Sequence, residues 1–405
     1  MTSMFSITPS ILVTSVLNPN LRVFDIVMPT EYGTSYNSYV VVGSEKIALI
    51  EAAHADFLDA YFAHLDAALE GRAPDYLVLD HTEPDHTGTV AALLERYPDL
   101  QIVISRSGAL FLQNIVNRAD LDCLIVGEGD TLDLGDKTLR FISAPLLHWP
   151  DTMFTYCPEE KVVFTCDFLG SHYCEPEVFD RHILYADAYE EALRQYFGGI
   201  MAPFKPYVRA GLEKLSALDV EVACVSHGPV LTRGCELERV IGRYGQWAAE
   251  EDSGRALRVP VFYCSAYGST KALAQRLVSG IRSVLPGAEV ASYDLIEHDL
   301  AELGALMNES DAFALGSPTI NRDALPVVWN LLAQADAINF AKRPVALFGS
   351  YGWSGEAAGH IAQRLTSLKA AVFEEQLRVQ FIPTEADLTA AETFGAAFAA
   401  TIAPQ

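Results

Sequence analysis

The residues best suited to chemistry lie in one short stretch, HTEPDH, which begins one residue after the apolar run YLVL. That run predicts a buried strand, so the stretch should stand at the end of a strand. Buried carboxylates and imidazoles are costly unless they are paired or bound to a metal. In an extended loop alternate residues share one side, so the first, third and fifth residues would face one centre and the sixth a second. The candidate metal ligands here are His81, Glu83, Asp85 and His86.

Three more candidate ligands follow later strand-like runs. His148, Asp167 and His227 each come directly after an apolar segment that is typical of a strand. Any one of them alone would more often be an ordinary surface or core residue. The repeated order of strand and then ligand, beside the first cluster, instead indicates a shared metal site.

A second set of candidates stands after the strand-like segment VPVFYC, which begins at Val259. A loop of hydroxyl groups and backbone N–H groups precedes a predicted helix at Lys271, and such a helix start can cradle a phosphate. The loop fits neither GxxxxGK[ST] nor GxGxxG, which disfavours ATP and dinucleotides. Its residues are Ser265, Ala266, Tyr267, Gly268, Ser269 and Thr270.

Two further loops follow the third and fourth strand-like segments of this half. In a doubly wound sheet such loops converge over the carboxyl ends of the strands, where ligands bind. The arrangement resembles flavodoxin, which implies FMN, with aromatic side chains beside its isoalloxazine ring. The residues concerned are Ser317, Pro318, Thr319, Ile320 and Asn321 in one loop, and Ser350, Tyr351, Gly352, Trp353, Ser354 and Gly355 in the other.

The order of the predicted strands and helices that must position these residues changes near residues 248–258. Before this charged, aperiodic segment, strand-like runs follow one another closely; after it, five strand–helix units alternate, which predicts a doubly wound parallel sheet. We therefore expect two domains, residues 1–250 and 251–405. The first should contain strands at 21–27, 38–42, 46–50, 76–79, 101–105, 123–126, 138–144, 161–165 and 222–225, and helices at 55–69, 89–97 and 188–197.

Composition narrows the class of protein. Of 405 residues, 53 are acidic and 28 basic, for a net charge of −25, which disfavours nucleic acid and anionic membranes as partners. No apolar run reaches the length of a membrane span, and the start of the chain lacks the features of a signal peptide, so we expect a soluble cytoplasmic protein. The seven cysteines include no CxxC pair, which argues against a disulfide framework and against a built-in rubredoxin module.

The order of ligands resembles the metallo-β-lactamase fold, an αββα sandwich whose hydrolases carry HxHxDH and typically bind zinc. Here Glu83 replaces the second histidine, and a harder, more anionic site suits redox iron better. HxExDH is the variant of the flavodiiron proteins. The resemblance implies one iron bound by His81, Glu83 and His148, a second bound by Asp85, His86 and His227, the bridge Asp167, and His172 and Tyr196 as neighbours of the ligands.

The resemblance to flavodiiron proteins covers nearly the whole chain, including TEYGTSYNSY and PTINRDALP, with small departures such as Ala266 and Gly199. It implies reduction of O2 to water, of NO to N2O, or of both, with electrons that pass from FMN to a diiron centre. A separate protein, usually rubredoxin in this family, should donate the electrons. The family's head-to-tail homodimer, or a dimer of such dimers, is expected as well.

Two other functions stay open at this stage. A zinc hydrolase with a regulatory flavodoxin domain would use the same first fold, although Glu83 argues against it. An FMN electron carrier without a working metal site would leave all seven candidate ligands idle. Metal analysis separates the three, since they predict two irons, two zincs or no metal per chain. O2 and NO are not distinguished, because the same ligands serve both.

Overall fold

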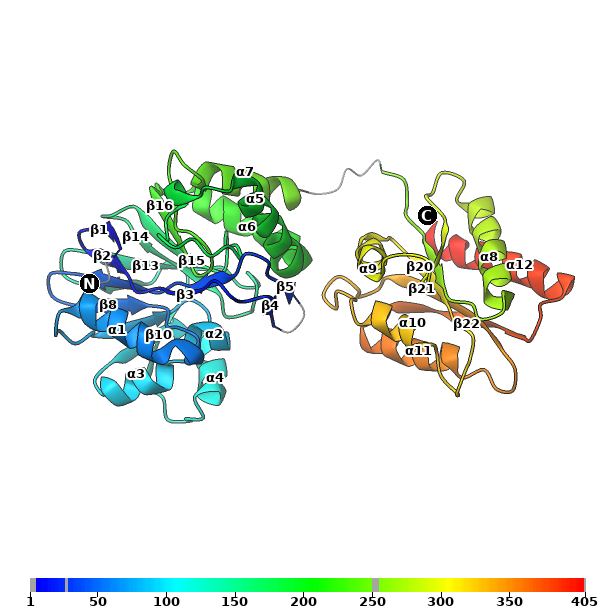
Figure 1. The fold of residues 1–405 in the computed structure, drawn as a ribbon, viewed down its shortest axis with the longest axis horizontal. Helices are drawn as coiled ribbons and strands as arrows, with labels where there is room; N and C mark the ends of the chain where they lie inside the picture. The colour runs from blue at the N-terminus through cyan, green and yellow to red at the C-terminus, as the bar shows by residue number, and fades with distance from the viewer. Residues whose placement is uncertain (1–4, 26–27, 250–254, 404–405) are drawn as a thin grey trace. The chain divides into compact units, whose positions relative to one another are not determined.

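The computed structural model describes residues 5–25, 28–249 and 255–403. The chain forms two compact units, residues 1–249 and 250–405, each with its own sheets and helices (Figure 1). The predicted linker at 248–258 falls between helix α7 (Leu237–Trp247) and strand β18 (Val261–Tyr263), and its residues 250–254 lie outside the described part.

The first unit contains two large sheets. One has the order β1-β2-β7-β8-β9-β10-β11 and the other β12-β13-β14-β15-β16-β17. The strands of the first sheet are β1 (Ser6–Thr8), β2 (Ile11–Val13), β7 (Tyr39–Val42), β8 (Ile47–Ile50), β9 (Tyr76–Leu79), β10 (Gln101–Ser105) and β11 (Cys123–Val126). Those of the second are β12 (Thr131–Asp133), β13 (Thr138–Ser143), β14 (Met153–Cys157), β15 (Val162–Cys166), β16 (Val222–Val225) and β17 (Leu231–Thr232). Two small pairs are formed by β3 (Val16–Asn18) with β6 (Thr34–Tyr36) and by β4 (Val23–Phe24) with β5 (Met28–Pro29). Of the strand predicted over 21–27, the described structure contains only β4, and residues 26–27 lie outside the described part.

Three apolar layers hold this unit together. One layer, with Val41 and Phe164, fills the space between the two sheets. A second packs helices against the outer face of the first sheet, and a third packs helices against the second sheet. This confirms the predicted αββα sandwich. The helices are α1 (Leu58–Leu69), α2 (Pro84–Thr87), α3 (Val90–Arg96) and α4 (Arg106–Ile115), then α5 (Ala186–Tyr196), the π-helical turn Phe197–Met201, α6 (Lys205–Ser216) and α7; short 3₁₀ turns span Ala55–Phe57, Asp180–His182 and Ala202–Phe204.

The second unit has one sheet of the order β19-β18-β20-β21-β22, in which every pair of neighbours is parallel. Its other strands are β19 (Ser292–Asp294), β20 (Phe313–Gly316), β21 (Pro344–Tyr351) and β22 (Ala371–Gln380). Helices α8 (Ser269–Val284) and α12 (Glu385–Ile402) cover one face, and α9 (Leu300–Glu309), α10 (Pro326–Leu332) and α11 (Ala357–Ser367) cover the other. The predicted doubly wound sheet is confirmed, and the strand order reverses between β18 and β20.

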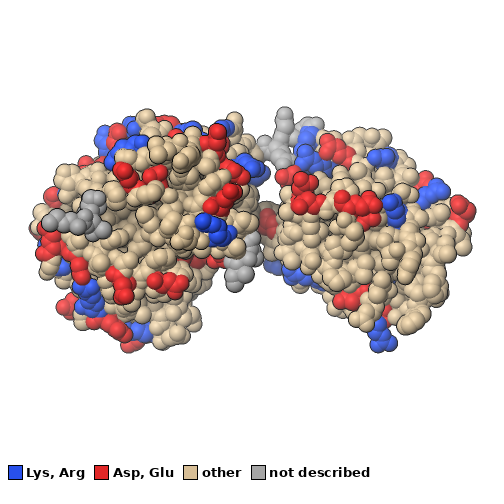
Figure 2. Space-filling model, in the orientation of Figure 1, with Lys and Arg blue, Asp and Glu red and all other residues tan. Residues whose placement is uncertain are grey.

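Acidic side chains are spread over the visible face of both units (Figure 2). This distribution agrees with the large negative net charge and shows no extended basic surface on that face. Among the described residues, we find no helix with the length and apolar character needed to cross a bilayer.

Candidate metal centre and flavin site

The HTEPDH stretch leaves β9 at the carboxyl edge of the first sheet and runs into the short helix α2. Pro84 occupies the first position of that helix, where a missing backbone N–H costs nothing. The expectation of one extended loop is therefore wrong for the end of the stretch. His81 and Glu83 precede the helix, whereas Asp85 and His86 lie on it, and this change of backbone direction turns them toward a different set of partners.

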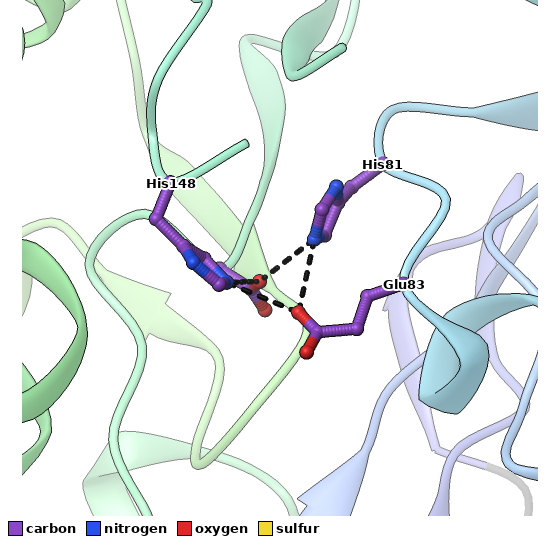
Figure 3. Close-up of side chains that lie close together, drawn as sticks. His81, Glu83 and His148 are labelled. Carbon is purple, nitrogen blue, oxygen red and sulfur yellow. Dashed lines mark hydrogen bonds and ion pairs between the residues drawn. The ribbon is translucent and has the colours of Figure 1, made fainter. Parts of the chain in front are cut away.

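The first group consists of His81, Glu83 and His148, which point toward one another (Figure 3). The Nε2 atoms of His81 and His148 both lie 3.1 Å from Glu83 Oε2. Asp167 Oδ2 completes the group, 3.3 Å from His148 Nε2 and 3.6 Å from His81 Nε2. One ligand atom from each of the four residues lies within 4.8 Å of the others, which is compact enough to surround one ion.

The second group faces the other oxygen of Asp167. Its Oδ1 lies 3.1 Å from His86 Nε2 and 3.3 Å from His227 Nε2. Asp85 closes the group, with Oδ2 3.1 Å from His227 Nε2 and Oδ1 3.4 Å from His86 Nε2. The structure thus brings all seven predicted ligands together, and one carboxylate lies between two groups, the position from which a bridge between two ions can act.

Burial and charge shape the protonation of these side chains. Burial alone would lower the pKa of His148, but hydrogen bonds to Asp167 and Glu83 raise that pKa to about 9. Burial likewise opposes the charge of His86, yet the carboxylates of Asp85 and Asp167 raise its pKa to about 10. The surrounding histidines hold the pKa of Asp167 well below its usual range, despite its burial. Without metal, protons on the histidines therefore balance the buried carboxylates, and metal ions would compete with those protons.

Asp151 contacts a predicted metal ligand but was not predicted from the sequence. Both of its carboxylate oxygens lie 3.3 Å from His81 Nδ1, which can donate to them. Thr82 donates to Oδ2 from its backbone N at 2.8 Å and from its hydroxyl at 2.7 Å, so the carboxylate is fixed. A carboxylate on the distal nitrogen of a histidine orients the ring toward a metal. The only signal in the sequence was an acidic residue three positions after His148.

His172 and Tyr196 both lie beside the second group. The ring of His172 is 5.3 Å from that of His227 and 4.9 Å from that of Tyr196, measured between centroids. Burial holds the pKa of His172 well below its usual value, so its ring is neutral; its Nδ1 lies 3.0 Å from the hydroxyl of Thr34. The Tyr196 hydroxyl donates to the backbone oxygen of Asp167 at 3.0 Å.

In the second unit a cavity of about 350 Å³ opens at the carboxyl edge of the sheet. It lies where the strand order reverses, the expected position for a ligand of such a sheet. All three predicted loops contribute to its lining. The predicted residues that line it are Ala266, Tyr267, Ser269, Pro318, Thr319, Ile320, Ser350, Tyr351 and Gly352.

The other predicted flavin residues support the loops or stand outside the cavity. Ser265 accepts a hydrogen bond from the backbone N of Lys271 at 3.3 Å, and buried Thr270 shares a 2.9 Å hydrogen bond with Ser350. Trp353 is 96% exposed. The remaining predicted residues, Gly268, Ser317, Asn321, Ser354 and Gly355, also do not line the cavity.

Phe381 and Ile382 line the cavity but were not predicted. They follow β22, which starts at Ala371 and ends at Gln380. Sequence reasoning could have found these two residues, because the carboxyl ends of all strands in a parallel sheet meet at one edge, and this holds for the fifth strand as well.

Comparison with known proteins agrees with both units. The family described as "ODP family beta lactamase" matches residues 34–228, and the family described as "Flavodoxin" matches residues 261–395. Over 388 residues the chain is 45% identical to Flavo-diiron protein FprA2 of Clostridium acetobutylicum, with 96% of each chain covered. The chain belongs to the flavodiiron proteins. This flavodiiron chain is also 32% identical to an anaerobic nitric oxide reductase flavorubredoxin of Vibrio vulnificus, over 83% of this chain and 68% of that one. The rubredoxin oxygen:oxidoreductase of Desulfovibrio gigas has the same fold, with a TM-score of 0.72, 26% identity, and 99% and 98% of the two chains covered.

As a flavodiiron protein, the chain is an oxidoreductase whose cofactors are FMN and a diiron centre. The side chains fit these groups. Asp85 is buried, yet neither of its oxygens accepts a hydrogen bond, although each faces a histidine Nε2; a shared ion would satisfy both sides. The cavity of the second unit has the size and mostly apolar lining of a cofactor site, beside the N-terminus of α8.

Proposed function

We propose that this flavodiiron protein reduces O2 to water, NO to N2O, or both, at a diiron site held by His81, Glu83, Asp85, His86, His148, Asp167 and His227. The position of Asp167 supports this most strongly, because its two carboxylate oxygens face two separate groups of histidines and carboxylates. When bound, two irons and FMN supply the four electrons that O2 needs, or the two electrons that two NO molecules need.

The names of relatives support the choice of gases. One relative is described as an anaerobic nitric oxide reductase and another as a rubredoxin oxygen:oxidoreductase. The same names suggest the electron donor, a rubredoxin that is separate from this chain. The proposal assigns the metal site to residues 1–250, the FMN site to residues 251–405, and the FMN contacts to the loops at 265–270, 317–321 and 350–355.

The direct test is anaerobic turnover with O2 and with NO in parallel, using one chemically reduced rubredoxin as the donor. We expect iron- and FMN-dependent consumption of at least one gas, with about two irons per chain by metal analysis. Two zincs per chain with no gas consumption would favour the hydrolase instead. FMN without any bound metal would favour a simple electron carrier.

We also propose a head-to-tail homodimer, alone or paired into a dimer of dimers. Electron transfer weakens steeply with distance, and in the family the FMN of one chain serves the irons of the other. Large side chains stand exposed around the flavin cavity, which supports an interface at this edge: Tyr267 is 97% exposed and Ile382 82%. Exposed apolar groups of this kind commonly mark protein contacts.

Mixed dimers test this arrangement. One chain carries His81→Ala with His86→Ala, and the other carries substitutions in the 265–270 loop that prevent FMN binding. Each homodimer should be inactive, whereas the purified mixed dimer should contain one intact pair of sites across its interface and show partial turnover. Mixed dimers as inactive as both parents would mean that electrons pass within one chain.

A further inference from the structure

His86 has one ring nitrogen whose role is unexplained. Its Nε2 faces Asp167 and Asp85, whereas its Nδ1 is buried and has no hydrogen-bond partner. Two other histidines of the site differ in this respect. The Nδ1 of His81 faces the Asp151 carboxylate, and the Nδ1 of His227 donates to the backbone oxygen of Ser35 at 2.8 Å. An orphaned N–H in a fully buried ring is costly, which points to a missing partner.

Glu51 lies where such a partner is needed. It is 1% exposed and follows β8 in a left-handed conformation, with φ +59°. Its Oε1 accepts a 2.7 Å hydrogen bond from the backbone N of Asp80, while its Oε2 has no partner. A carboxylate oxygen of Glu51, a ring nitrogen of His86 and the Cys166 sulfur lie within 4.8 Å of one another.

Backbone hydrogen bonds hold Glu51 beside His86. Ala52 donates to the backbone oxygen of His86 at 3.0 Å. The backbone N of Ala53 donates to the Thr89 hydroxyl at 3.1 Å, and the backbone N of Thr89 donates to the backbone oxygen of Ala53 at 3.1 Å. The segment after β8 is thus tied to the backbone at and after His86, which keeps the Glu51 carboxylate beside the His86 ring.

We infer that Glu51 is the positioning residue of His86: its carboxylate accepts the Nδ1–H and holds the ring with the Nε2 lone pair toward the second iron. This role presupposes the proposed function, in which His86 binds iron. A carboxylate with two lone pairs on each oxygen can accept from both Nδ1 and the Asp80 backbone at once. It would do for His86 what Asp151 does for His81, and loss of such a partner typically weakens metal binding about 10–100-fold.

The test is anaerobic titration of the metal-free, FMN-loaded full chain with Co²⁺, which gives the affinity of each of two ions. In Glu51→Gln we expect one ion to bind about 10–100-fold more weakly and the other to bind as in wild type. Asp80→Asn is the matched control, since it removes a second buried carboxyl of the same cluster; it should not weaken that ion selectively.

The outcomes are distinct. If wild type binds two ions and Glu51→Gln binds both with unchanged affinity, the role of Glu51 is wrong while the proposed site stands. Equal losses in Glu51→Gln and Asp80→Asn would also overturn it, because they would reflect the loss of any buried carboxyl group of the cluster rather than of one hydrogen bond. A wild-type chain that binds no pair of ions would overturn both the site and the inference.

A measurement on the unaltered protein guards against a variant that fails to fold. In the zinc-substituted, FMN-loaded chain, ¹H–¹⁵N NMR reports which ring nitrogen of His86 carries the proton. We expect a protonated Nδ1 whose hydrogen exchanges slowly with water, because it is buried in a hydrogen bond. An Nδ1 hydrogen that exchanges rapidly with water would refute the role of Glu51 without any substitution, whereas a proton on Nε2 would overturn the assignment of His86 as a metal ligand and with it the proposed site.

Discussion

Substitution of the shared carboxylate, Asp167→Asn, should separate the two metal groups from each other. The amide keeps the shape of the side chain but replaces one oxygen with an NH2 group, which cannot bind a metal and carries no charge. Since Oδ1 faces His86 and His227 while Oδ2 faces His81 and His148, one group loses its shared ligand outright. The other keeps only a neutral oxygen.

The size of the effect follows from the burial of the site. Asp167 is 2% exposed, and removal of one partner from a buried ionic arrangement costs about 3–5 kcal/mol. At 1.4 kcal/mol for each factor of ten, this corresponds to an affinity about 140- to 4,000-fold lower for at least one ion. We expect fewer than two irons per chain after anaerobic reconstitution, and gas reduction that falls with the iron content.

Metal content by mass spectrometry and FMN content by absorbance, measured on the same sample, provide the assay. FMN should stay at the wild-type level, because its cavity lies in the other unit. Asp180→Asn is a matched control: Asp180 is also 2% exposed in the first unit, but it accepts hydrogen bonds from Thr232 and Glu236 rather than facing the ligands. Two tightly bound irons and wild-type turnover in Asp167→Asn would refute the bridging role.

Three further predictions follow from other parts of the structure. If the 265–270 loop holds a phosphate, riboflavin should bind far more weakly than FMN in a fluorescence titration, and equal affinities would count against that loop. Because the pKa values of His148 and His86 are raised to about 9 and about 10, both carry protons at pH 7 in the metal-free protein; metal uptake should release protons, and affinity should increase as the pH rises toward 9, as calorimetry in buffers of different ionisation enthalpy can check. Gly349→Ala would place a Cβ 2.2 Å from a backbone oxygen, so overpacking of about 1–3 kcal/mol should lower the melting temperature of the flavin unit by about 2–12 °C; Gly359→Ala, in a helix with open space around it, should not, and equal melting temperatures would contradict the argument.

Local patterns in the sequence were sufficient for the main elements of both units. Strands such as β9 and β16 lie where the apolar runs predicted them, because a buried strand appears in the sequence as a short run of consecutive apolar residues. Helix α4 was missed, since it starts directly after β10 and Ser105 ends the strand while also capping the helix. A boundary that one residue shares between two elements leaves no separate signal in a local pattern.

The sequence by itself determined which residue types could bind metal and FMN, and that strand ends present them. Only the tertiary structure decided how they meet. Asp151 reaches His81 from 70 positions away, and the two oxygens of Asp167 face different groups because β15 brings them between loops from both sheets. Contacts of this kind depend on strand register and loop direction, which are set by the packing of whole layers. The spacing of residues along the chain does not encode that packing. For this reason Asp151, which faces His81, and Glu51, which lies beside His86, could be identified only in the folded chain.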